Sequence, residues 1–341
     1  MKNGGTDLDQ NQEKVRKKRL KRLYFKTLFI SLAVLAGLIA AAYGTFTYML
    51  SGMNRSAVDI SKLSVNEDLE RYGGNEIANI VFYGIDSRNH DYTGLSDAIM
   101  VVSIDKRDAE IKLVSIARDT YVSVPGYHNT KINHAYLWGG PELAIKTLNE
   151  NFDMDITDYV TVNFDSLADI IDAVGGIDLE VSEAEREQIN AYLLKGPRLE
   201  ESGMVHLTGP QAVSYSRIRK IDSDDMRTQR QRKVLSLLFE KALDISPLKY
   251  PSYIKKFAPI VETSLTNDEI LRIASVGMKS GLKLEQASFP NDYIKSGGER
   301  IDGMWYYVYD IEQASDMLHQ FIYNDIPFEE YAKHTGASME E

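Results

Sequence analysis

The residues best suited to chemistry lie between Tyr215 and Arg232, where the chain places five arginines and one lysine within eighteen positions. This concentration stands out because the whole chain carries a formal net charge of −11. An arginine side chain carries five N–H donors in a planar fork that matches phosphate oxygens. The stretch therefore predicts a local anion-binding site. The alternative is a solvated helix face neutralised by the aspartates of the same stretch, namely Asp222, Asp224 and Asp225.

The spacing of the cationic residues divides them into two groups. Arg217 and Arg219 share a face if the chain is extended there, because side chains alternate along a strand. The second group shares a face if the chain is helical, because residues three and four apart are neighbours on a helix; it comprises Arg227, Arg230 and Gln231. Arg232 lies one position further along and is expected to point away from that face.

Polar side chains also stand at the ends of three predicted strands. Asp86 directly follows the first strand, and Asp97 precedes the second. Neighbouring carboxylates at strand ends suit a Mg²⁺ ion that keeps several waters and takes phosphate as a further ligand. Arg118 ends the third strand and adds another phosphate donor. The alternatives are ordinary caps of a turn and a strand for the two aspartates, and a local ion pair with Asp119 for the arginine.

The elements that must position these residues alternate between strands and helices. Apolar, β-branched runs predict strands over 77–85, 98–105, 111–118, 121–124, 156–164, 177–181, 282–288 and 303–309. Helical patterns and caps predict helices over 141–152, 165–174, 183–194, a short one from 208, and others over 224–243, 249–260, 266–280 and 311–322. Residues 106–110 form a polar turn, so the second and third strands are expected to pair as a hairpin. The fold class is therefore α/β, with a single mixed-sheet domain flanked by helices.

The charge distribution separates the N-terminus from the rest of the chain. Residues 1–26 carry nine basic and three acidic side chains, a net charge of +6, which leaves 30 basic and 47 acidic residues over 27–341. No charged residue occurs over 27–54, and the apolar run over 28–50 is long enough to cross a bilayer, which takes about 20 helical residues. Basic residues flanking such a run are expected on the cytoplasmic side. A cleaved signal peptide is the alternative, although its apolar region normally has about 7–15 residues.

These observations predict the following organisation. We expect a basic cytoplasmic tail over 1–26, a single-pass transmembrane anchor over 27–50, a stalk over 51–76, an extracytoplasmic domain over 77–330 and a C-terminal tail over 331–341. The absence of cysteine excludes disulfides, thiolate metal sites and cysteine nucleophiles. The six histidines lack the spacing of a zinc site. The acidic body argues against nucleic acid as a partner.

Seven ordered segments within residues 79–245 resemble the catalytic domain of the LytR–CpsA–Psr family of bacterial envelope proteins. The segments are Asn79–Arg88, Leu95–Ser103, Leu113–Tyr121, Lys131–Tyr136, Gly139–Ala144, Val174–Asp178 and Tyr215–Arg232. Their order over half the chain is far more specific than any one of them. One departure is Ala117, which stands where the family usually has proline before Arg118 and Asp119.

The resemblance implies a phosphotransferase that moves a glycopolymer, such as teichoic acid or capsule, from a polyprenyl-diphosphate carrier to peptidoglycan through a phosphodiester. It implies Mg²⁺, with Mn²⁺ as an alternative, held by Asp86 and Asp97. The residues implied to bind the diphosphate are Arg88, Arg118, Arg217, Arg219, Arg227, Arg230 and Gln231. Those implied to take part in catalysis are Arg118, Arg217, Arg219 and Asp224.

Several points stay open at this level. Asp224 and Asp119 are both candidates for a general base, and the reaction could proceed without one. The apolar residues 170–174 and 234–239 could line a lipid tunnel or simply form core. A non-catalytic sensor of polyprenyl diphosphate would use the same binding groups. A transcriptional attenuator fits less well, because about 26 cytoplasmic residues leave no room for a helix-turn-helix. The polymer, the acceptor hydroxyl and the oligomeric state are not encoded in any motif.

Overall fold

The computed structural model describes residues 37, 41, 43–72, 76–85, 92–222, 224–243, 245–246, 249–277 and 282–335. The chain divides into two units, residues 1–51 and residues 52–341. In the first unit, residues 43–50 are helical. Among the described residues, no helix combines the length and apolar character needed to cross a membrane. The predicted tail over 1–26 and most of the predicted anchor over 27–50 lie outside the described residues.

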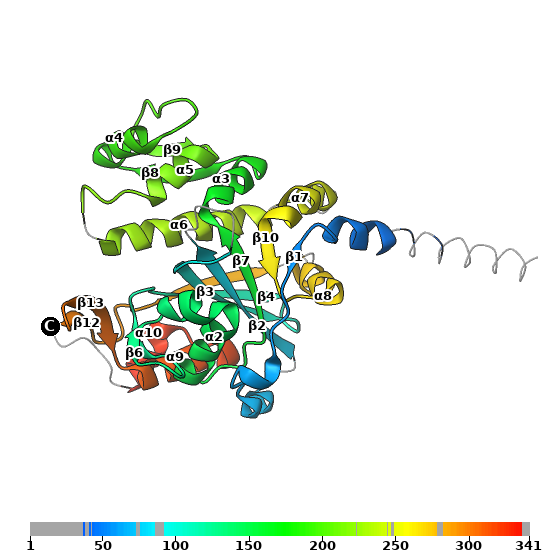
Figure 1. The fold of residues 1–341 in the computed structure, drawn as a ribbon, viewed down its shortest axis with the longest axis vertical. Coiled ribbons are helices and arrows are strands. Elements are labelled where there is room, and N and C mark those ends of the chain that lie inside the picture. Colours follow the sequence, from blue (N-terminus) through cyan, green and yellow to red (C-terminus); the bar gives the residue numbers. More distant parts are fainter. Residues whose placement is uncertain are drawn as a thin grey trace, which may run out of the picture. The chain divides into compact units, whose positions relative to one another are not determined.

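A seven-stranded sheet forms the centre of the second unit (Figure 1). Its strands, in spatial order, are β1 (Asn54–Arg55), β10 (Val261–Thr263), β7 (Asp158–Asn163), β2 (Ile77–Ile85), β3 (Ser96–Asp105), β4 (Glu110–Ile116) and β11 (Lys283–Phe289). The predicted hairpin is confirmed, because β3 and β4 pair antiparallel. Because β2 runs parallel to β7 and antiparallel to β3, the sheet is mixed. The mixed α/β class expected from the sequence is therefore confirmed.

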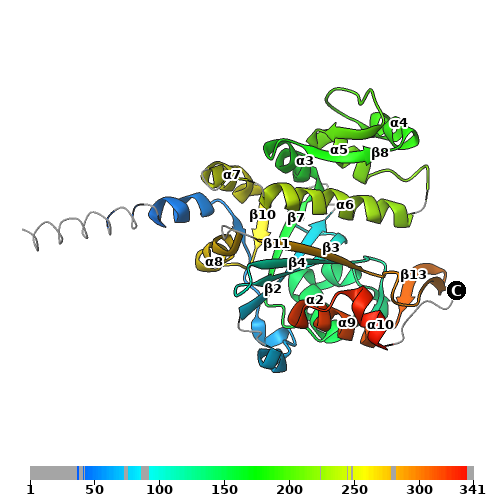
Figure 2. The same ribbon diagram turned by 180° about the vertical axis from the view of Figure 1, so that it is seen from behind.

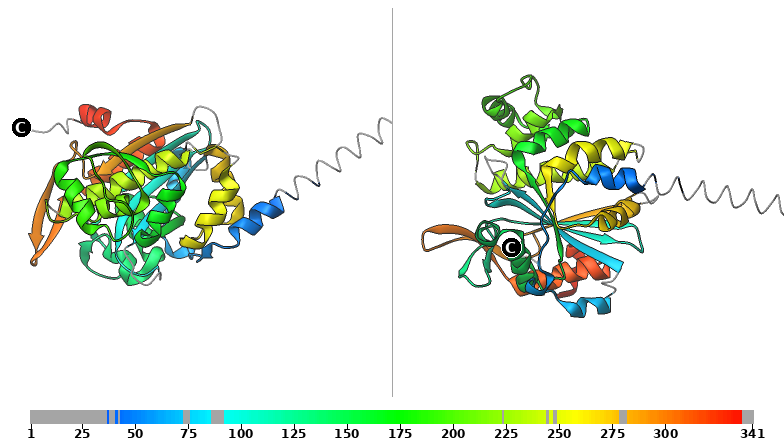
Figure 3. Two further views of the ribbon diagram at one scale, coloured as in Figure 1. Left: turned by 90° about the horizontal axis from the view of Figure 1, so that it is seen from above. Right: turned by 45° about the vertical axis from the view of Figure 1, so that its right-hand side comes forward.

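Helices cover both faces of this sheet (Figures 2 and 3). On one face lie α2 (His134–Phe152), α9 (Ile311–Asn324) and α10 (Phe328–Thr335). On the other lie α3 (Phe164–Ala173), α4 (Glu183–Tyr192), α5 (Gly209–Ser216), α6 (Asp224–Leu243), α7 (Tyr250–Phe257) and α8 (Asn267–Gly277). Alternation along β3 supplies both cores: Ile99 and Val101 face the first group, and Met100 faces the second.

Three small hairpins complete the unit. They are β5 (Tyr121–Ser123) with β6 (Asn129–Lys131), β8 (Ile177–Val181) with β9 (Gly203–Leu207), and β12 (Ser296–Ile301) with β13 (Met304–Tyr309). The sequence pattern missed β1, β6, β9, β10 and β12. It also missed helix α10, in which Tyr331 and Ala332 are buried, so the folded unit extends beyond residue 330, the predicted end of the domain. Most of β12 is exposed and contains two glycines, and β10 has only three residues, so neither carries the apolar run on which strand prediction depends.

Residues 51–76, expected to form a stalk, pack in part onto the folded unit. Strand β1 pairs with β10 at the edge of the sheet. Two short 3₁₀ helices follow, η1 (Ile60–Lys62) and η2 (Glu67–Tyr72). Leu63 and Leu69 are fully buried in the core beside α2 and α9. The prediction of a stalk was wrong because these two leucines are isolated in a polar segment, where no apolar periodicity indicates that they are buried.

Helix α2 begins earlier than the predicted start at Pro141. Its first turn opens at His134, and the helix is interrupted at Gly139 and Gly140 before Pro141 restarts it. Gly140 has a φ of +62°, a conformation that residues with a Cβ seldom adopt. The two glycines therefore allow the chain to change direction between a short helix and a long one.

Candidate functional site

Several strands end at the same edge of the sheet. Register pairs Ile85, the last residue of β2, with Ser96 at the start of β3 and with Asn163 at the end of β7. On the other side of β3, the end of β4 pairs with the end of β11. Asp97 and Arg118, which adjoin these strand ends, therefore lie at the same edge of the sheet.

Asp97 occupies an irregular position in the sheet. Gly84 pairs with Ala98, but Ile85 pairs with Ser96, so Asp97 is an extra residue on β3. Bulges of this kind redirect a side chain and are common next to active sites. The carboxylate accepts a hydrogen bond from Nη1 of Arg118 at 2.6 Å, and both side chains are about nine-tenths buried. The strand geometry thus brings together two residues that are 21 positions apart in the chain, and they form a buried ion pair.

Two further charges extend this pair into a short row. Nε of Arg118 donates to Asp119 at 3.3 Å, and Nζ of Lys131 donates to the other oxygen of Asp119 at 2.7 Å. Asp97, Arg118, Asp119 and Lys131 therefore alternate in sign. Asp119, one of the candidates for a general base, has both of its oxygens engaged by cations. Lys131 lies in one of the seven sequence segments, but the sequence did not predict it as a site residue, because only the β5–β6 hairpin brings it to Asp119.

Helix α6 carries the second group of predicted residues. Arg227 and Gln231 are 2% and 5% exposed. They lie on the face that continues into Val234 and Leu238, which belong to the core shared with the sheet and α5. In Figure 1, α6 crosses between the sheet and the group formed by α3, α4, α5, β8 and β9. The core-facing side of α6 is therefore apolar over most of its length but carries an arginine and a glutamine near its N-terminal end.

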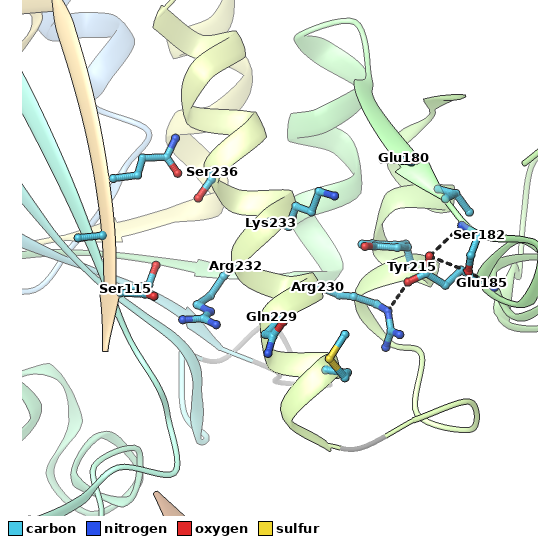
Figure 4. A pocket seen from close by; sticks show the side chains of 15 residues that line it. Ser115, Glu180, Ser182, Glu185, Tyr215, Gln229, Arg230, Arg232, Lys233 and Ser236 are labelled. Atoms are coloured by element: carbon cyan, nitrogen blue, oxygen red, sulfur yellow. Dashed lines mark hydrogen bonds and ion pairs between the residues drawn. The ribbon is translucent and has the colours of Figure 1, made fainter. Parts of the chain in front are cut away.

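Arg230 lies on a neighbouring side of α6 and has different partners. Its Nε donates to Glu185 at 2.9 Å, and its two terminal nitrogens donate to Asp222. Its guanidinium also lies over the ring of Tyr215, 5.8 Å from the centroid. Burial by itself would raise the pKa of Glu185, but hydrogen bonds from the Ser182 backbone and from Arg230 outweigh it and hold that pKa below its usual value. Arg230 is therefore engaged by protein carboxylates, as Figure 4 shows for Glu185.

The first pair of arginines flanks a buried anchor. Arg217 caps the C-terminus of α5 in a helical conformation, with φ −97° and ψ 0°, so the chain is not extended at this point. Ile218 is fully buried, whereas Arg217 is partly exposed and Arg219 is exposed. The two cationic side chains therefore emerge on either side of a fixed isoleucine.

Three predicted site residues cannot be placed in this geometry. Asp86 and Arg88 lie outside the described residues, and the side chain of Asp224, the first residue of α6, is not described. The structure brings Asp97 to Arg118 and Asp119, and it places Arg227, Gln231, Arg217 and Arg219 on α6 and on the segment before it. Helix α6 packs on β3, the strand that includes Asp97, so the two groups belong to adjoining elements.

The residues at the strand edge suit a Mg²⁺ ion. Besides the carboxylate of Asp97, Ser96 offers a buried hydroxyl oxygen that has no hydrogen-bond partner within the described part of the chain. Hard oxygen donors of this type are those that Mg²⁺ prefers, together with water and phosphate. No group of three or more acidic or histidine side chains arranged for a metal occurs among the described residues. Such a site would therefore depend on Asp86 and on phosphate as further ligands.

The sequence segments, the mixed sheet and the buried Asp97–Arg118 pair all lie within the span that one family model matches. The family model described as LytR_cpsA_psr matches residues 46–322, so the chain belongs to this family, as the resemblance predicted. A relative from Bacillus cereus (strain AH820), named polyisoprenyl-teichoic acid–peptidoglycan teichoic acid transferase TagU, is 32% identical over 292 residues. That match covers 83% of this chain and 92% of the relative.

Solved structures show the same fold. A structure described as TagT bound to LIIa-WTA is 26% identical, with a TM-score of 0.60 over 74% of this chain and 91% of that one. The structure of TagV from B. subtilis is 28% identical, with a TM-score of 0.57 over 72% of this chain and 97% of that one. The present chain is thus similar over most of its length to proteins of this family.

Proposed function

We propose that this protein transfers an anionic glycopolymer, a teichoic acid or a related polymer, from a polyprenyl-diphosphate carrier to peptidoglycan. Membership of the family and the name of the Bacillus cereus relative support the reaction class. The observation that carries the proposal is the buried pair of Asp97 and Arg118 at the strand edge, next to a helix whose core-facing side bears Arg227 and Gln231. A buried guanidinium next to further cationic and amide donors matches a bound diphosphate.

In the proposed reaction, a hydroxyl of peptidoglycan attacks the phosphorus that carries the polymer. The bond between that phosphorus and the oxygen of the lipid phosphate breaks, so polyprenyl phosphate leaves and a phosphodiester forms. The proton of the hydroxyl passes to solvent or to a general base. Asp224 remains a candidate for that base. Phosphoryl transfer depends mainly on positioning and on stabilisation of negative charge.

The roles of the residues follow from their placement. Arg118, fixed by Asp97 and Asp119, would hold one phosphoryl group without having to reorganise during the reaction. Arg227 and Gln231 would contact the diphosphate from α6, and Arg217 and Arg219 from the segment before it; Arg88 would join them from the β2–β3 connection. Mg²⁺, or Mn²⁺ in its place, held by Asp86 and Asp97, would neutralise part of the diphosphate charge.

We further propose that residues 27–50 anchor the protein in the cell membrane, with the N-terminus cytoplasmic and the folded unit outside. The uncharged run over 27–54 and the basic block that precedes it support this topology. It would place the site next to a substrate whose carrier is a membrane lipid.

One experiment separates transfer from mere sensing. The full-length protein in detergent is incubated with a lipid-linked polymer, peptidoglycan and Mg²⁺, and both linked polymer and released polyprenyl phosphate are measured. Both products should appear together, and Arg118→Ala should abolish them. Arg300→Ala, which changes an exposed arginine of β12, serves as the control. Tight binding of the lipid-linked polymer without either product would favour the sensor and contradict the transferase.

A further inference from the structure

A groove of about 690 Å³ lies along the side of α6 that is turned away from the core (Figure 4). Its α6 residues include Gln229, Lys233 and Ser236, which follow a spacing of four and three and so share one side of the helix. These three side chains are exposed or half-buried, in contrast to Arg227 and Gln231 on the core-facing side. Of the α6 residues assigned to the diphosphate, Arg227 and Gln231 do not line the groove, whereas Arg230 does.

The lining of this groove is rich in hydroxyl and amide groups. Strands β4 and β11 form one wall, and the end of β8 with the start of α4 forms the other. The uncharged polar residues that line it are Ser115, Ser182, Gln229, Ser236, Gln286 and Ser288. Ser182 and Gln286 already donate to Glu185 and Glu240. A serine hydroxyl also accepts hydrogen bonds, and a glutamine amide keeps a second N–H and its oxygen, so these groups can still match the mixed donors and acceptors of a sugar ring. Few apolar side chains line the groove, which argues against a polyprenyl chain as its occupant.

The charges in the groove are nearly balanced. Arg232 and Lys233 contribute two cations beside Arg230, and Glu180 and Glu185 contribute two anions. All three guanidinium nitrogens of Arg230 already donate to Glu185 or Asp222, so it adds little attraction for a bound anion. A polyanionic chain gains most from a surface with a clear excess of positive charge. The balance here favours a glycan of low charge density.

We propose that this groove binds a glycan strand of low charge, which in the reaction proposed above is the peptidoglycan acceptor. The assignment of acceptor rests on that proposed function, whereas the glycan chemistry rests on the lining alone. Two residues that line the groove are close in sequence to residues assigned to the phosphate site. Ser115 lies three residues before Arg118, and Met226, another lining residue, immediately precedes Arg227. A glycan strand bound in the groove would thus lie next to the residues assigned to the diphosphate.

The test measures binding directly, without turnover. The full-length protein in detergent is titrated by calorimetry with three probes: chitohexaose, peptide-free peptidoglycan strands, and a soluble teichoic acid. Ser236→Trp fills the groove from its floor, Ser236→Ala leaves it open, and Ser275→Trp makes the same steric change on an exposed position of α8. Thermal unfolding followed by circular dichroism checks that each variant folds.

We expect the two hexosamine probes to bind the wild type, and Ser236→Trp to weaken them at least about tenfold, a change of about 1.4 kcal/mol. Ser236→Ala and Ser275→Trp should bind nearly as the wild type does. Absence of binding by the wild type, or unchanged binding by Ser236→Trp, would overturn the inference. So would teichoic acid binding that Ser236→Trp abolishes while the hexosamine probes fail to bind.

The outcome is distinguishable from a failure of the proposed function. If glycan binding is absent while polymer transfer proceeds, only the groove assignment is wrong. If the glycans bind at the groove while neither linked polymer nor polyprenyl phosphate forms, the transferase is wrong and the glycan site stands.

Discussion

Arg230 of α6 and Glu185 of α4 form a buried ion pair, with Nε of the arginine 2.9 Å from Oε1 of the glutamate. Asp222, in the segment between α5 and α6, binds the same guanidinium from another direction. The pair thus connects α4, α6 and the segment that carries Arg219. The helical spacing predicted that Arg230 shares a face with Arg227, and the family resemblance implied that both bind the diphosphate. Its contacts instead support a role in holding that segment in place, and any contact with diphosphate remains a prediction.

Replacement of Arg230 by alanine should destabilise the fold. The substitution would leave Glu185 and Asp222 without the cation that compensates for their partial burial, and loss of one partner of a buried pair costs about 3–5 kcal/mol. Urea unfolding followed by circular dichroism measures the change. Arg300→Ala, at an exposed position, should change the free energy of unfolding by less than about 0.5 kcal/mol. A similarly small effect for Arg230→Ala would contradict the structural role.

The same ion pair should make stability depend on acid pH. The pKa of Glu185 is lowered from its ordinary value of 4.5, so the folded state binds fewer protons than the unfolded chain in this range. The stabilisation is present above about pH 4.5 and is lost as the pH falls through the lowered pKa of the folded state. The free energies of unfolding of wild type and Glu185→Gln should therefore differ more at pH 7 than at pH 3. Glu299→Gln, on exposed β12, is the control; a gap that does not shrink in acid would show that Glu185 is not the titrating group.

Arg219→Ala should weaken diphosphate binding without affecting the fold. Its side chain is exposed, so the free energy of unfolding should change by less than about 0.5 kcal/mol. Loss of a charge-assisted hydrogen bond should reduce affinity by about 1.5–3 kcal/mol, or roughly 10- to 100-fold. Calorimetric titration with a short polyprenyl diphosphate measures this. Unchanged affinity would remove Arg219 from the site.

Arg118→Ala should affect both properties, because this arginine is buried between two aspartates. Its removal takes a hydrogen-bond donor from Asp97 and one from Asp119, which keeps its contact with Lys131. We expect a loss of stability of about 3 kcal/mol or more together with loss of diphosphate binding. Arg118→Lys keeps the charge but not the planar fork, so it should recover stability more than affinity. Equal recovery of both would argue that charge alone, and not the geometry of the guanidinium, is required.

Removal of Mg²⁺ should weaken diphosphate binding by the wild type. Titration with the short polyprenyl diphosphate in MgCl₂ and again in EDTA measures the effect, independently of turnover. Asp97→Asn and Asp86→Ala should each bind weakly and respond little to EDTA, because each lacks a proposed ligand. Asp108→Asn, in the exposed turn between β3 and β4, should respond as the wild type does. A full EDTA response in both Asp97→Asn and Asp86→Ala would refute the proposed metal ligands.

The amino-acid sequence by itself determined the features that depend on nearby residues. Apolar, β-branched runs placed β2, β3 and β4, and the polar turn between the last two predicted their hairpin. Helical spacing placed Arg227 and Gln231 on one face, which the structure confirms. Seven ordered segments were enough to predict the family. The signals for the strands and for the helix face are local, because side-chain direction in a helix or strand follows from a period of a few residues.

Only the tertiary structure decided which of the charged residues are neighbours. The bulge at Asp97 directs its carboxylate to Arg118, and strand pairing, not sequence distance, brings these two together. Arg230 shares the helical spacing of Arg227 and Gln231, yet it pairs with Glu185, which lies 45 positions earlier. Leu63 and Leu69 enter the core from a segment without periodicity. Such contacts join residues far apart in the chain, and no local pattern encodes them because they arise only when the elements pack.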